Sequence, residues 1–477
     1  MSHPSENLAK KLDRDQCRQY LKDQVFRLRP ADYCEKYPNW PGMVGIELEM
    51  GVIQRNTMML RKPKVAQLAG PVSLTSVLLE LAKAQGWNAV MAEGKDYLKC
   101  VMLNDNDQLT FEPGGQLEFS SRTYPCLSQV IARMNEVQGL LDDALAKSGM
   151  VLIQYGINPW LTVKEVGLQM NKPRYQAMDK YFGLIGEFGQ RMMRQTCTVQ
   201  VCLDFGPDER TMAKRYLASN LLAPIATAIF ANSPVVDGRL TEFRSFRSQT
   251  WRKLDFSRTG VPKLERIVAE LSVDSCIDAY LEAILAARVV FVEALDFRAM
   301  DGSVTFEDWL NQPIDGVSPT QQDLETHLSL FFPEVRARGF LEMRSVDCQA
   351  RAFQSVPAAF YSALLYEDRN LDQVLELLVP YHRSIDRLLR ASAYGLQQDA
   401  TLADLAQRVM YLAVEGYRRL PSCFHDAATD KAIIYFHEHF TARRRTPADD
   451  IADARIDARY PPTPEGLMNI YNEWVLP

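Results

Sequence analysis

The stretch GIELEMGV, residues 45–52, decides the fold of this chain. Successive side chains of a β-strand point to opposite faces, so Ile46 and Leu48 share one face. Glu47 and Glu49 then share the other face, about 7 Å apart along the strand. The pattern predicts a strand with one face against an apolar core and one acidic face. Two such carboxylates can bind a hard cation, and an exposed strand with hydrated acids is the simpler alternative.

On either side of this strand, short β-like runs alternate with helical stretches. This mixture predicts an α+β fold in which helices cover one face of a sheet. The later β-like runs are KCVMLNDNDQLTFEP at 99–113, GQLEFSS at 115–121, MVLIQYGINPW at 150–160, TCTVQVCLDF at 196–205 and FLEMRSVD at 340–347. A helix is expected at 209–231 and helical pattern at 261–298, whereas 242–260 and 299–320 look like loops.

Composition and charge exclude several classes of function. The formal net charge is −6 and no long Lys/Arg run occurs, which argues against nucleic acid or an anionic membrane as partner. No stretch approaches the roughly 20 apolar residues of a membrane-spanning helix, and the first residues are polar. Nine cysteines form no CxxC pair, which suits a reducing compartment. We therefore expect a soluble, cytoplasmic protein, a monomer or homodimer, that acts on small molecules.

A second group of acids follows in LTFEPGGQLEFSS. Glu112, Gln116 and Glu118 have equal parity along this run, and the intervening PGG allows the backbone to turn or bulge. Glu118 lies in the better strand and is the first choice as a third metal ligand. Glu112 precedes a proline and could equally end the strand, so Glu112 and Gln116 are secondary candidates.

Two further predicted strands have polar side chains at alternate positions, so that these side chains share one face of each strand. In TCTVQVCLDF, Gln200 shares a face with Cys202 and could bind a metal or a phosphate oxygen, or be an ordinary sheet amide. In FLEMRSVD, Glu342 could ligate a metal while Arg344, on the same face, clamps a transferring phosphate. A plain ion pair between the two is the alternative.

The segment FRSFRSQTWRKLDFSRTG, residues 243–260, is dense in planar donors. Arg247 and Arg258 lie here beside Trp251, a composition that suits carboxylate or phosphate recognition. Solvated surface arginines are the default explanation for any one position. The group as a whole predicts an anionic ligand.

Several of these segments together resemble one family. They are EPGGQLE at 112–118, YGINPW at 155–160, KPRYQAMDKYF at 172–182, TCTVQVCLDF at 196–205, PIATAIFANSP at 224–234, FRSQTW with DFSRTG at 246–260, and FFPEVRARGFLEMRSVD at 331–347. In this order they resemble the plant-type glutamate–cysteine ligases shared with proteobacteria. These enzymes belong to the glutamine-synthetase-like carboxylate–amine ligases.

The resemblance implies a curved, mainly antiparallel six-stranded sheet forming a funnel, with ATP as co-substrate and two or three Mg²⁺ ions. Arg344 and Arg247 are then the catalytic candidates, and Arg247 and Trp251 resemble a pair that holds glutamate. The implied metal-site residues are Glu47, Glu49, Glu118, Gln200 and Glu342. Tyr155 and Arg258 are further substrate-binding candidates, and Glu112, Gln116, Lys172, Arg174 and Arg194 are secondary ones.

The implied reaction joins the γ-carboxylate of L-glutamate to the amine of L-cysteine through γ-glutamyl phosphate. A paralogous ligase with another amine acceptor, in a secondary-metabolite pathway, is the alternative within the class. A non-catalytic ligand sensor is disfavoured because the acids are retained. The sequence departs from the plant pattern in two places. IELEMGV replaces a TEHEKFG-like motif, keeping both acids but losing the basic residue after them, and SVDCQA follows LEMR in place of a glycine-rich turn, a change that bears on acceptor specificity.

Three parts of the chain are expected. Residues 1–40 form an N-terminal helical segment and 41–370 form the catalytic ligase domain. Residues 371–477 form a helical layer packed on that same domain, because their pattern is amphipathic.

Overall fold

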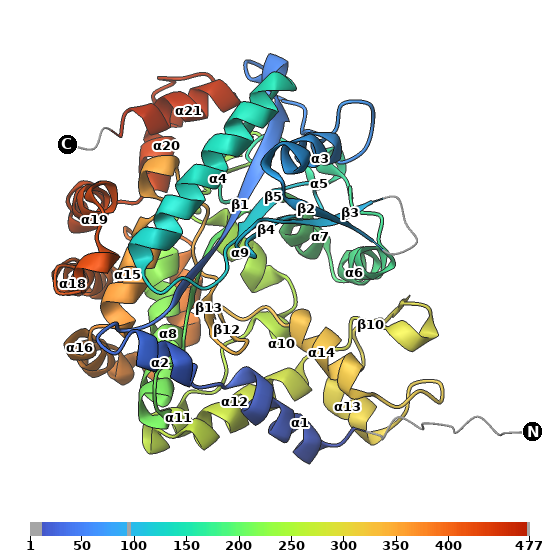
Figure 1. The fold of residues 1–477 in the computed structure, drawn as a ribbon, viewed down its shortest axis with the longest axis vertical. Coiled ribbons are helices and arrows are strands. Elements are labelled where there is room, and N and C mark those ends of the chain that lie inside the picture. Colours follow the sequence, from blue (N-terminus) through green and yellow to red (C-terminus); the bar gives the residue numbers. More distant parts are fainter. Residues whose placement is uncertain (1–11, 93–96, 475–477) are drawn as a thin grey trace, which may run out of the picture.

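The computed structural model describes residues 12–92 and 97–474 (Figure 1). Its main sheet has nine strands, antiparallel throughout, in the order β12-β13-β7-β1-β5-β4-β3-β2, with β6 also paired to β1. The strands are β1 Val44–Gln54, β2 Asn88–Met91, β3 Leu98–Met102, β4 Gln108–Phe111, β5 Leu117–Ser120, β6 Met150–Ile153, β7 Val199–Leu203, β12 Val335–Ala337 and β13 Leu341–Met343. Two-residue strands form two small ribbons, β8 Val235–Val236 with β9 Arg239–Leu240 and β10 Phe291–Val292 with β11 Arg298–Ala299.

The α+β class and the antiparallel pairing agree with expectation, but the predicted number of six strands is wrong. The run at 99–113 contains two strands, because Asn106 has a φ of 67° and closes a turn between β3 and β4. β2 is a partly exposed edge strand without an alternating pattern, so alternation could not predict it.

Strand β1 lies at the centre of the sheet. Its even-numbered side chains from Val44 to Val52 are buried and apolar, and helices α4 (Leu127–Lys147) and α15 (Val356–Leu365) contact this strand. Burying one apolar side chain contributes roughly 1.5–3 kcal/mol, so the buried face fixes which way the acids point. The odd-numbered face is left for Glu47 and Glu49.

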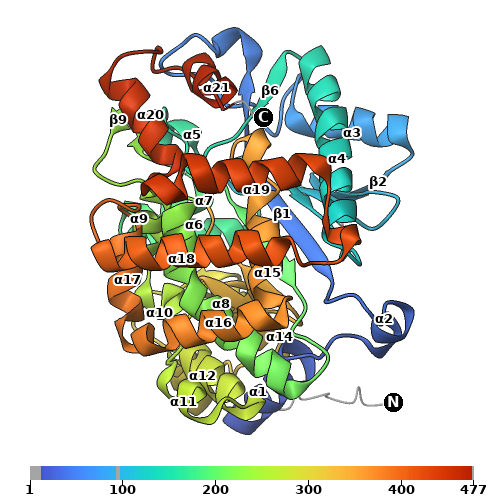
Figure 2. The ribbon, with the colours of Figure 1, turned by 90° about the vertical axis from the view of Figure 1, so that its left-hand side faces the viewer.

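Helices surround the sheet, and Figure 2 shows α16, α18 and α19 lying one above another on one side of the molecule. None of the described helices is long and apolar enough to cross a membrane. The other helices are α1 Arg14–Tyr20, α2 Ala31–Lys36, α3 Leu74–Gln85, α5 Val163–Val166, α6 Pro173–Leu184, α7 Glu187–Gln195, α8 Glu209–Ile229, α9 Phe246–Lys253, α10 Phe256–Thr259, α11 Glu265–Glu270, α12 Val273–Ala286, α13 Phe306–Asn311 and α14 Gln321–Ser329. The C-terminal ones are α16 Asp368–Leu378, α17 Ile385–Ser392, α18 Ala400–Tyr417, α19 Ala427–His439, α20 Pro447–Ile456 and α21 Pro464–Asn472.

Both segments read as loops contain helices. Ser245 and Asp255 cap α9 and α10 by accepting hydrogen bonds from backbone N–H groups, and Thr305 caps α13 in the same way. The many arginines and turn residues of these segments favoured a loop over a helix, so the caps were missed.

The predicted N-terminal helical segment begins at residues 1–11, which lie outside the described residues. Its described part contains α1 and α2, and the division into three parts stays a prediction.

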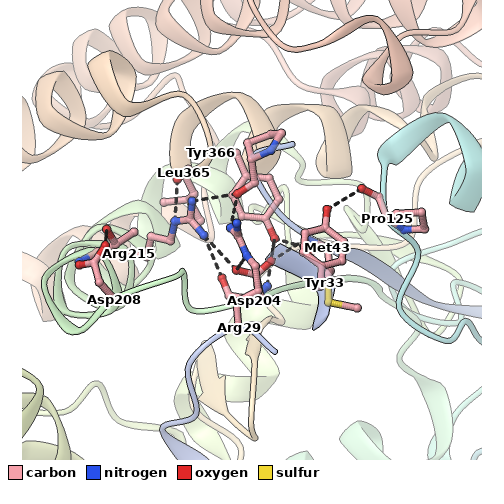
Figure 3. A network of polar contacts seen from close by, with 11 residues as sticks. Arg29, Tyr33, Met43, Pro125, Asp204, Asp208, Arg215, Leu365 and Tyr366 are labelled. Atoms are coloured by element: carbon pink, nitrogen blue, oxygen red, sulfur yellow. Dashed lines mark hydrogen bonds and ion pairs between the residues drawn. The ribbon is translucent and has the colours of Figure 1, made fainter. Parts of the chain in front are cut away.

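A buried polar network holds the start of β1 against the end of β7 (Figure 3). Asp204, just after β7, accepts hydrogen bonds from the Met43 backbone N–H at 2.6 Å and from Arg29 at 2.9 Å. Arg215 reaches the same carboxylate at 3.2 Å. The Tyr366 hydroxyl accepts from the Asp204 N–H at 3.0 Å and donates to the Met43 carbonyl. The two strands that hold the candidate site are thereby fixed relative to each other.

The buried apolar residues form one large cluster and a second, smaller one. The large cluster includes residues from Leu12 to Trp474. The smaller lies between α6, α7 and the segment 254–332, and it includes Met178, Met193 and Phe332. It borders the cavity described next.

Candidate active site

A cavity of about 530 Å³ opens on the polar face of the sheet. This volume lies in the range of small-molecule sites, roughly 300–1,000 Å³. The strands contribute acids, amides and hydroxyls to it, whereas α6 and α7 contribute mostly methionine and aromatic side chains. The lining includes Glu47, Glu49, Thr110, Glu112, Glu118, Ser120, Arg174, Tyr175, Met178, Met192, Met193, Thr196, Thr198, Gln200, Trp251, Phe332, Arg336, Arg338 and Arg344.

Strand register brings the sequence-predicted acids together. Glu49 in β1 is the direct cross-strand partner of Glu118 in β5, and Glu47 is the partner of Gln200 in β7. Glu112 lies beside these acids because it begins the hairpin turn between β4 and β5. A backbone hydrogen bond closes this turn, in which the Gly115 N–H donates to the Glu112 carbonyl at 2.8 Å. A Cβ on Gly114 in this turn would collide with the backbone of Arg194, so glycine is required there.

Carboxylate oxygens of Glu49, Glu112 and Glu118 lie within 4.8 Å of one another. Burial, together with the Glu118 charge, raises the pKa of Glu49 to about 7 and the pKa of Glu112 well above its usual range. Three crowded acids are unfavourable unless protons or a cation compensate their charge. An all-oxygen donor set of this kind fits Mg²⁺, which prefers carboxylates over nitrogen or sulfur.

Glu47 lies at the edge of this cluster. Burial and the neighbouring charges of Glu342 and Glu118 raise its pKa to about 8. Its carboxylate makes no hydrogen bond among the described residues. Glu49, in contrast, accepts from the Thr198 N–H and from the Gln200 amide, both at 3.0 Å. Glu47 is therefore the less restrained of the two strand acids.

Gln200 connects the acid cluster to an arginine. Its amide nitrogen donates to Glu49 and its oxygen accepts from Arg344 Nη1 at 2.6 Å. The same Nη1 also donates to Glu342 at 3.0 Å. The Nε of Arg344 is buried without a partner, so this guanidinium retains a donor for a ligand in the cavity.

Glu342 is a neighbour of Glu47 but not a member of the three-acid cluster. It is fully buried, does not line the cavity, and both its oxygens accept from arginines: Arg336 at 2.5 and 3.0 Å and Arg338 at 3.4 Å. These arginines keep the pKa of Glu342 below its ordinary value although burial opposes them. Its geometry suits the orientation of Arg344 better than metal ligation. Sequence reasoning missed Arg336, although it faces Glu342 across the hairpin turn that contains Gly339.

Arg247 and Trp251 lie together, as the resemblance implied. The guanidinium of Arg247 lies 4.6 Å from the Trp251 ring centroid. Its Nη2 donates to the Arg344 carbonyl at 2.7 Å, and its Nη1 is 3.8 Å from Asp347. Trp251 lines the cavity, whereas Arg247 does not. Arg247 thus supports two cavity residues, and its buried Nε has no partner.

Two predicted substrate-binding residues lie elsewhere. Tyr155 packs on Gly51 and lines a separate cavity of about 40 Å³ near α21. Arg258 is fully buried, and its donors go to Asp255 at 3.0 Å, to the Leu330 carbonyl at 2.6 Å and to the Arg288 carbonyl. Neither side chain has access to the main cavity.

Of the secondary candidates, Glu112 and Arg174 line the cavity. Gln116 is buried, with its amide donating to the Thr196 carbonyl at 2.9 Å. Lys172 lies over the rings of Tyr97 and Tyr175, and Arg194 is paired with Asp179. These three do not line the cavity.

Clustered carboxylates and arginines on the polar face of an antiparallel sheet are typical of the class of enzymes that act on anionic substrates with divalent cations. Comparison with known proteins narrows this class. The chain belongs to glutamate–cysteine ligase family 2, a family of ligases whose profile matches residues 43–431.

Its relatives include plant enzymes. The chloroplastic glutamate–cysteine ligase of Medicago truncatula is 32% identical, over 72% of this chain and 68% of that protein. The chloroplastic enzymes of Nicotiana tabacum and Arabidopsis thaliana are also 32% identical, over 82% and 79% of this chain and 72% and 70% of theirs. Among solved structures, a bifunctional glutathione synthetase from Pasteurella multocida aligns with a TM-score of 0.47 and 11% identity, covering 94% of this chain and 54% of that one.

Proposed function

We propose that this protein joins the γ-carboxylate of L-glutamate to the amine of L-cysteine, with cleavage of ATP to ADP and phosphate. The product, γ-glutamylcysteine, would be the first intermediate of glutathione biosynthesis. Membership of the family and the names of its relatives support this reaction. The observation that carries the proposal is the cluster of Glu49, Glu112 and Glu118 beside Arg344 in one cavity.

Glu49, Glu112 and Glu118 would hold Mg²⁺, with Glu47 and Gln200 as further donors. When bound, Mg²⁺ withdraws charge from the terminal phosphate of ATP. The number of ions, two or three, stays a prediction, as do the cytoplasmic location and the oligomeric state.

Arg344 is placed to stabilise charge on the phosphate that is transferred. Glu342 and Gln200 hold its Nη1, so the guanidinium cannot turn away, and its buried Nε is left to donate to a phosphate oxygen. A γ-carboxylate oxygen of glutamate forms a bond to the γ-phosphorus while the bond from that phosphorus to ADP breaks. Preorganised donors of this kind lower the barrier because they need no rearrangement during the reaction.

The second step forms the amide. The acceptor nitrogen attacks the γ-carbonyl carbon, the C–O bond to phosphate breaks, and the proton released by the nitrogen leaves with the phosphate. Water would destroy the acyl phosphate, so the cavity must be closed to it. Trp251 and Phe332, both largely buried at the cavity wall, contribute to this exclusion.

The test is an assay of the purified chain with ATP, MgCl₂, L-glutamate and L-cysteine. We expect ADP and γ-glutamylcysteine in equal amounts, the amide being identified by mass. Replacement of cysteine by hydroxylamine should trap the acyl phosphate as γ-glutamyl hydroxamate. ADP formation without an amide, or a higher kcat/KM with an unrelated amine than with cysteine, would contradict the proposal.

A further inference from the structure

Two hydroxyl groups lie beside Glu118 on the polar face of the sheet. Thr110 in β4 is the direct cross-strand partner of Glu118, and Ser120 is two residues further along β5. Both residues line the cavity. Strands β4, β5 and β1 are neighbours in the sheet (Figure 1), and Glu49 is the partner of Glu118 on the β1 side. Glu118 is therefore flanked by a hydroxyl on one neighbouring strand and by an acid on the other.

Both hydroxyls donate to the same oxygen of Glu118. The distance to Glu118 Oε1 is 2.8 Å from the Thr110 hydroxyl and 2.7 Å from the Ser120 hydroxyl. A carboxylate oxygen has about two lone-pair positions, so these two donors occupy Oε1 completely. No described residue donates a hydrogen bond to Oε2. Oε2 is therefore the oxygen of Glu118 that is left for a cation.

Glu49 is held in a different way. Its Oε2 accepts from the Thr198 N–H and its Oε1 accepts from the Gln200 amide, so each oxygen has one donor and keeps one lone pair. Donors that only compensate the charge of an acid can be shared between its two oxygens, as they are at Glu49. The donors at Glu118 are both on one oxygen, and this asymmetry restricts how that carboxylate can bind a cation.

The restriction affects Mg²⁺ and Ca²⁺ differently. Mg²⁺ takes six ligands in an octahedron at about 2.0–2.1 Å, and one oxygen of a carboxylate provides one of them. Ca²⁺ is larger, takes roughly 6–8 oxygens at about 2.3–2.6 Å, and binds carboxylates through one oxygen or through both. Because the hydroxyls occupy Oε1, Glu118 keeps the binding mode that Mg²⁺ uses and loses the additional mode that is open to Ca²⁺.

We propose that Thr110 and Ser120 make the metal site selective for Mg²⁺ over Ca²⁺. They hold Glu118 so that Oε2 alone binds the cation, and they are positioning residues because they act through Glu118 without binding the metal. This inference rests on the proposed function, since it presumes that Glu118 is a ligand of Mg²⁺.

The experiment measures the Kd of the metal-free protein for each cation. MgCl₂ or CaCl₂ displaces bound Mn²⁺, and the free Mn²⁺ is followed by electron paramagnetic resonance. The double variant Thr110→Val/Ser120→Ala frees Oε1 with little change in side-chain shape. We expect its Kd for Mg²⁺ to rise by about tenfold, as is typical when groups that orient a metal ligand are lost. Its Kd for Ca²⁺ should rise by less than about threefold or fall, because the freed oxygen supplies a further ligand.

The ratio of the Kd for Ca²⁺ to the Kd for Mg²⁺ should therefore decrease by at least about threefold in the double variant. Thr110→Ser keeps the hydroxyl and should keep the wild-type ratio. Thr198→Val is the matched control, because it removes a hydroxyl that lines the same cavity but makes no hydrogen bond with any described residue. Its ratio should also equal that of the wild type. Thermal unfolding of each variant identifies a loss caused by misfolding.

Each other outcome contradicts a particular statement. If the double variant loses affinity for Mg²⁺ and Ca²⁺ equally, the hydroxyls only stabilise the acid, and the inference is overturned while the ligase function stands. An equal decrease of the ratio in Thr198→Val would assign the selectivity to the general polarity of the cavity. A wild type that forms γ-glutamylcysteine but binds no Mn²⁺ overturns the inference alone. A wild type that releases no ADP with all substrates present overturns the proposed function itself.

Discussion

The carboxylate cluster makes the metal-free protein less stable at neutral pH than at acid pH, and Glu49→Gln tests this. Glu49 is buried, and its pKa is raised from 4.5 to about 7. An acid with a raised pKa binds its proton more tightly in the native protein than in the unfolded chain. Its contribution to stability is therefore complete below pH 4.5 and is lost as the pH rises to about 7.

The size of the effect follows from the pKa and the hydrogen bonds. Ionising Glu49 in the native state costs about 3 kcal/mol relative to the unfolded chain, at about 1.4 kcal/mol for each pH unit. Glutamine avoids this cost but loses one of the two acceptors that bind Thr198 and Gln200, about 1–2 kcal/mol at any pH. Relative to the wild type, the variant should gain about 2.5 kcal/mol between pH 5 and pH 8, because a small part of the cost is already present at pH 5.

The assay is urea unfolding of wild type and Glu49→Gln in EDTA at pH 5 and pH 8, repeated with MgCl₂ at pH 8. Ligand at 100 times its Kd stabilises the native state by about 2.7 kcal/mol, so Mg²⁺ should stabilise the wild type by about that amount and the variant, which has lost one of three carboxylates, by less. The variant should also lose ligase activity. If the difference in unfolding free energy is the same at both pH values, Glu49 does not titrate as described and the reasoning is refuted.

Three further predictions concern other parts of the molecule. Glu112→Gln should raise the Mg²⁺ concentration for half-maximal activity by about tenfold, because one of three carboxylates is lost; an unaltered Mg²⁺ titration would remove Glu112 from the metal site. Tyr366→Phe should lower the unfolding free energy by about 2–3 kcal/mol, since it leaves the Asp204 N–H and the Met43 carbonyl unpaired. The measurement is urea unfolding, and a loss below about 0.5 kcal/mol would show that these two groups find other partners. Arg258→Met should cost about 3–5 kcal/mol in stability without changing the KM for glutamate of the folded fraction, and a raised KM would return Arg258 to the substrate site.

Alternation along strands was sufficient to predict the acidic face of the sheet. Glu47, Glu49 and Gln200 line the cavity, as their parity and apolar neighbours indicated, because period-2 alternation is a local property of the chain. Glu112, a secondary candidate, lies beside Glu49 and Glu118, and its position could not be predicted because it depends on how the PGG turn closes. The ion pair between Glu342 and Arg336 was not predicted, because Arg336 lies across a hairpin whose register the sequence did not show; ligation of a metal by Glu342 stays a prediction.

Contacts between residues far apart in the sequence account for most of the remaining differences between the predicted and the observed positions of residues. Arg258 looked like a ligand-binding arginine, yet its partners Leu330 and Arg288 are 72 and 30 residues away and only the tertiary fold brings them together. Tyr155 follows a strand, but its ring covers Gly51 on the neighbouring strand instead of facing the cavity. The helices α9 and α10 were missed although Ser245 and Asp255 are ordinary capping residues.

The central strand has a consequence for how this gene can vary. β1 pairs with β5, β6 and β7 and exposes acids and apolar side chains at alternate positions. Deletion of a single codon between Val44 and Glu49 would shift every following side chain by one position and exchange the two faces. The carboxylates would then point into the apolar core of the protein, and leucine would point into the cavity. Substitutions can accumulate one at a time along this strand, but a change in its length cannot be tolerated.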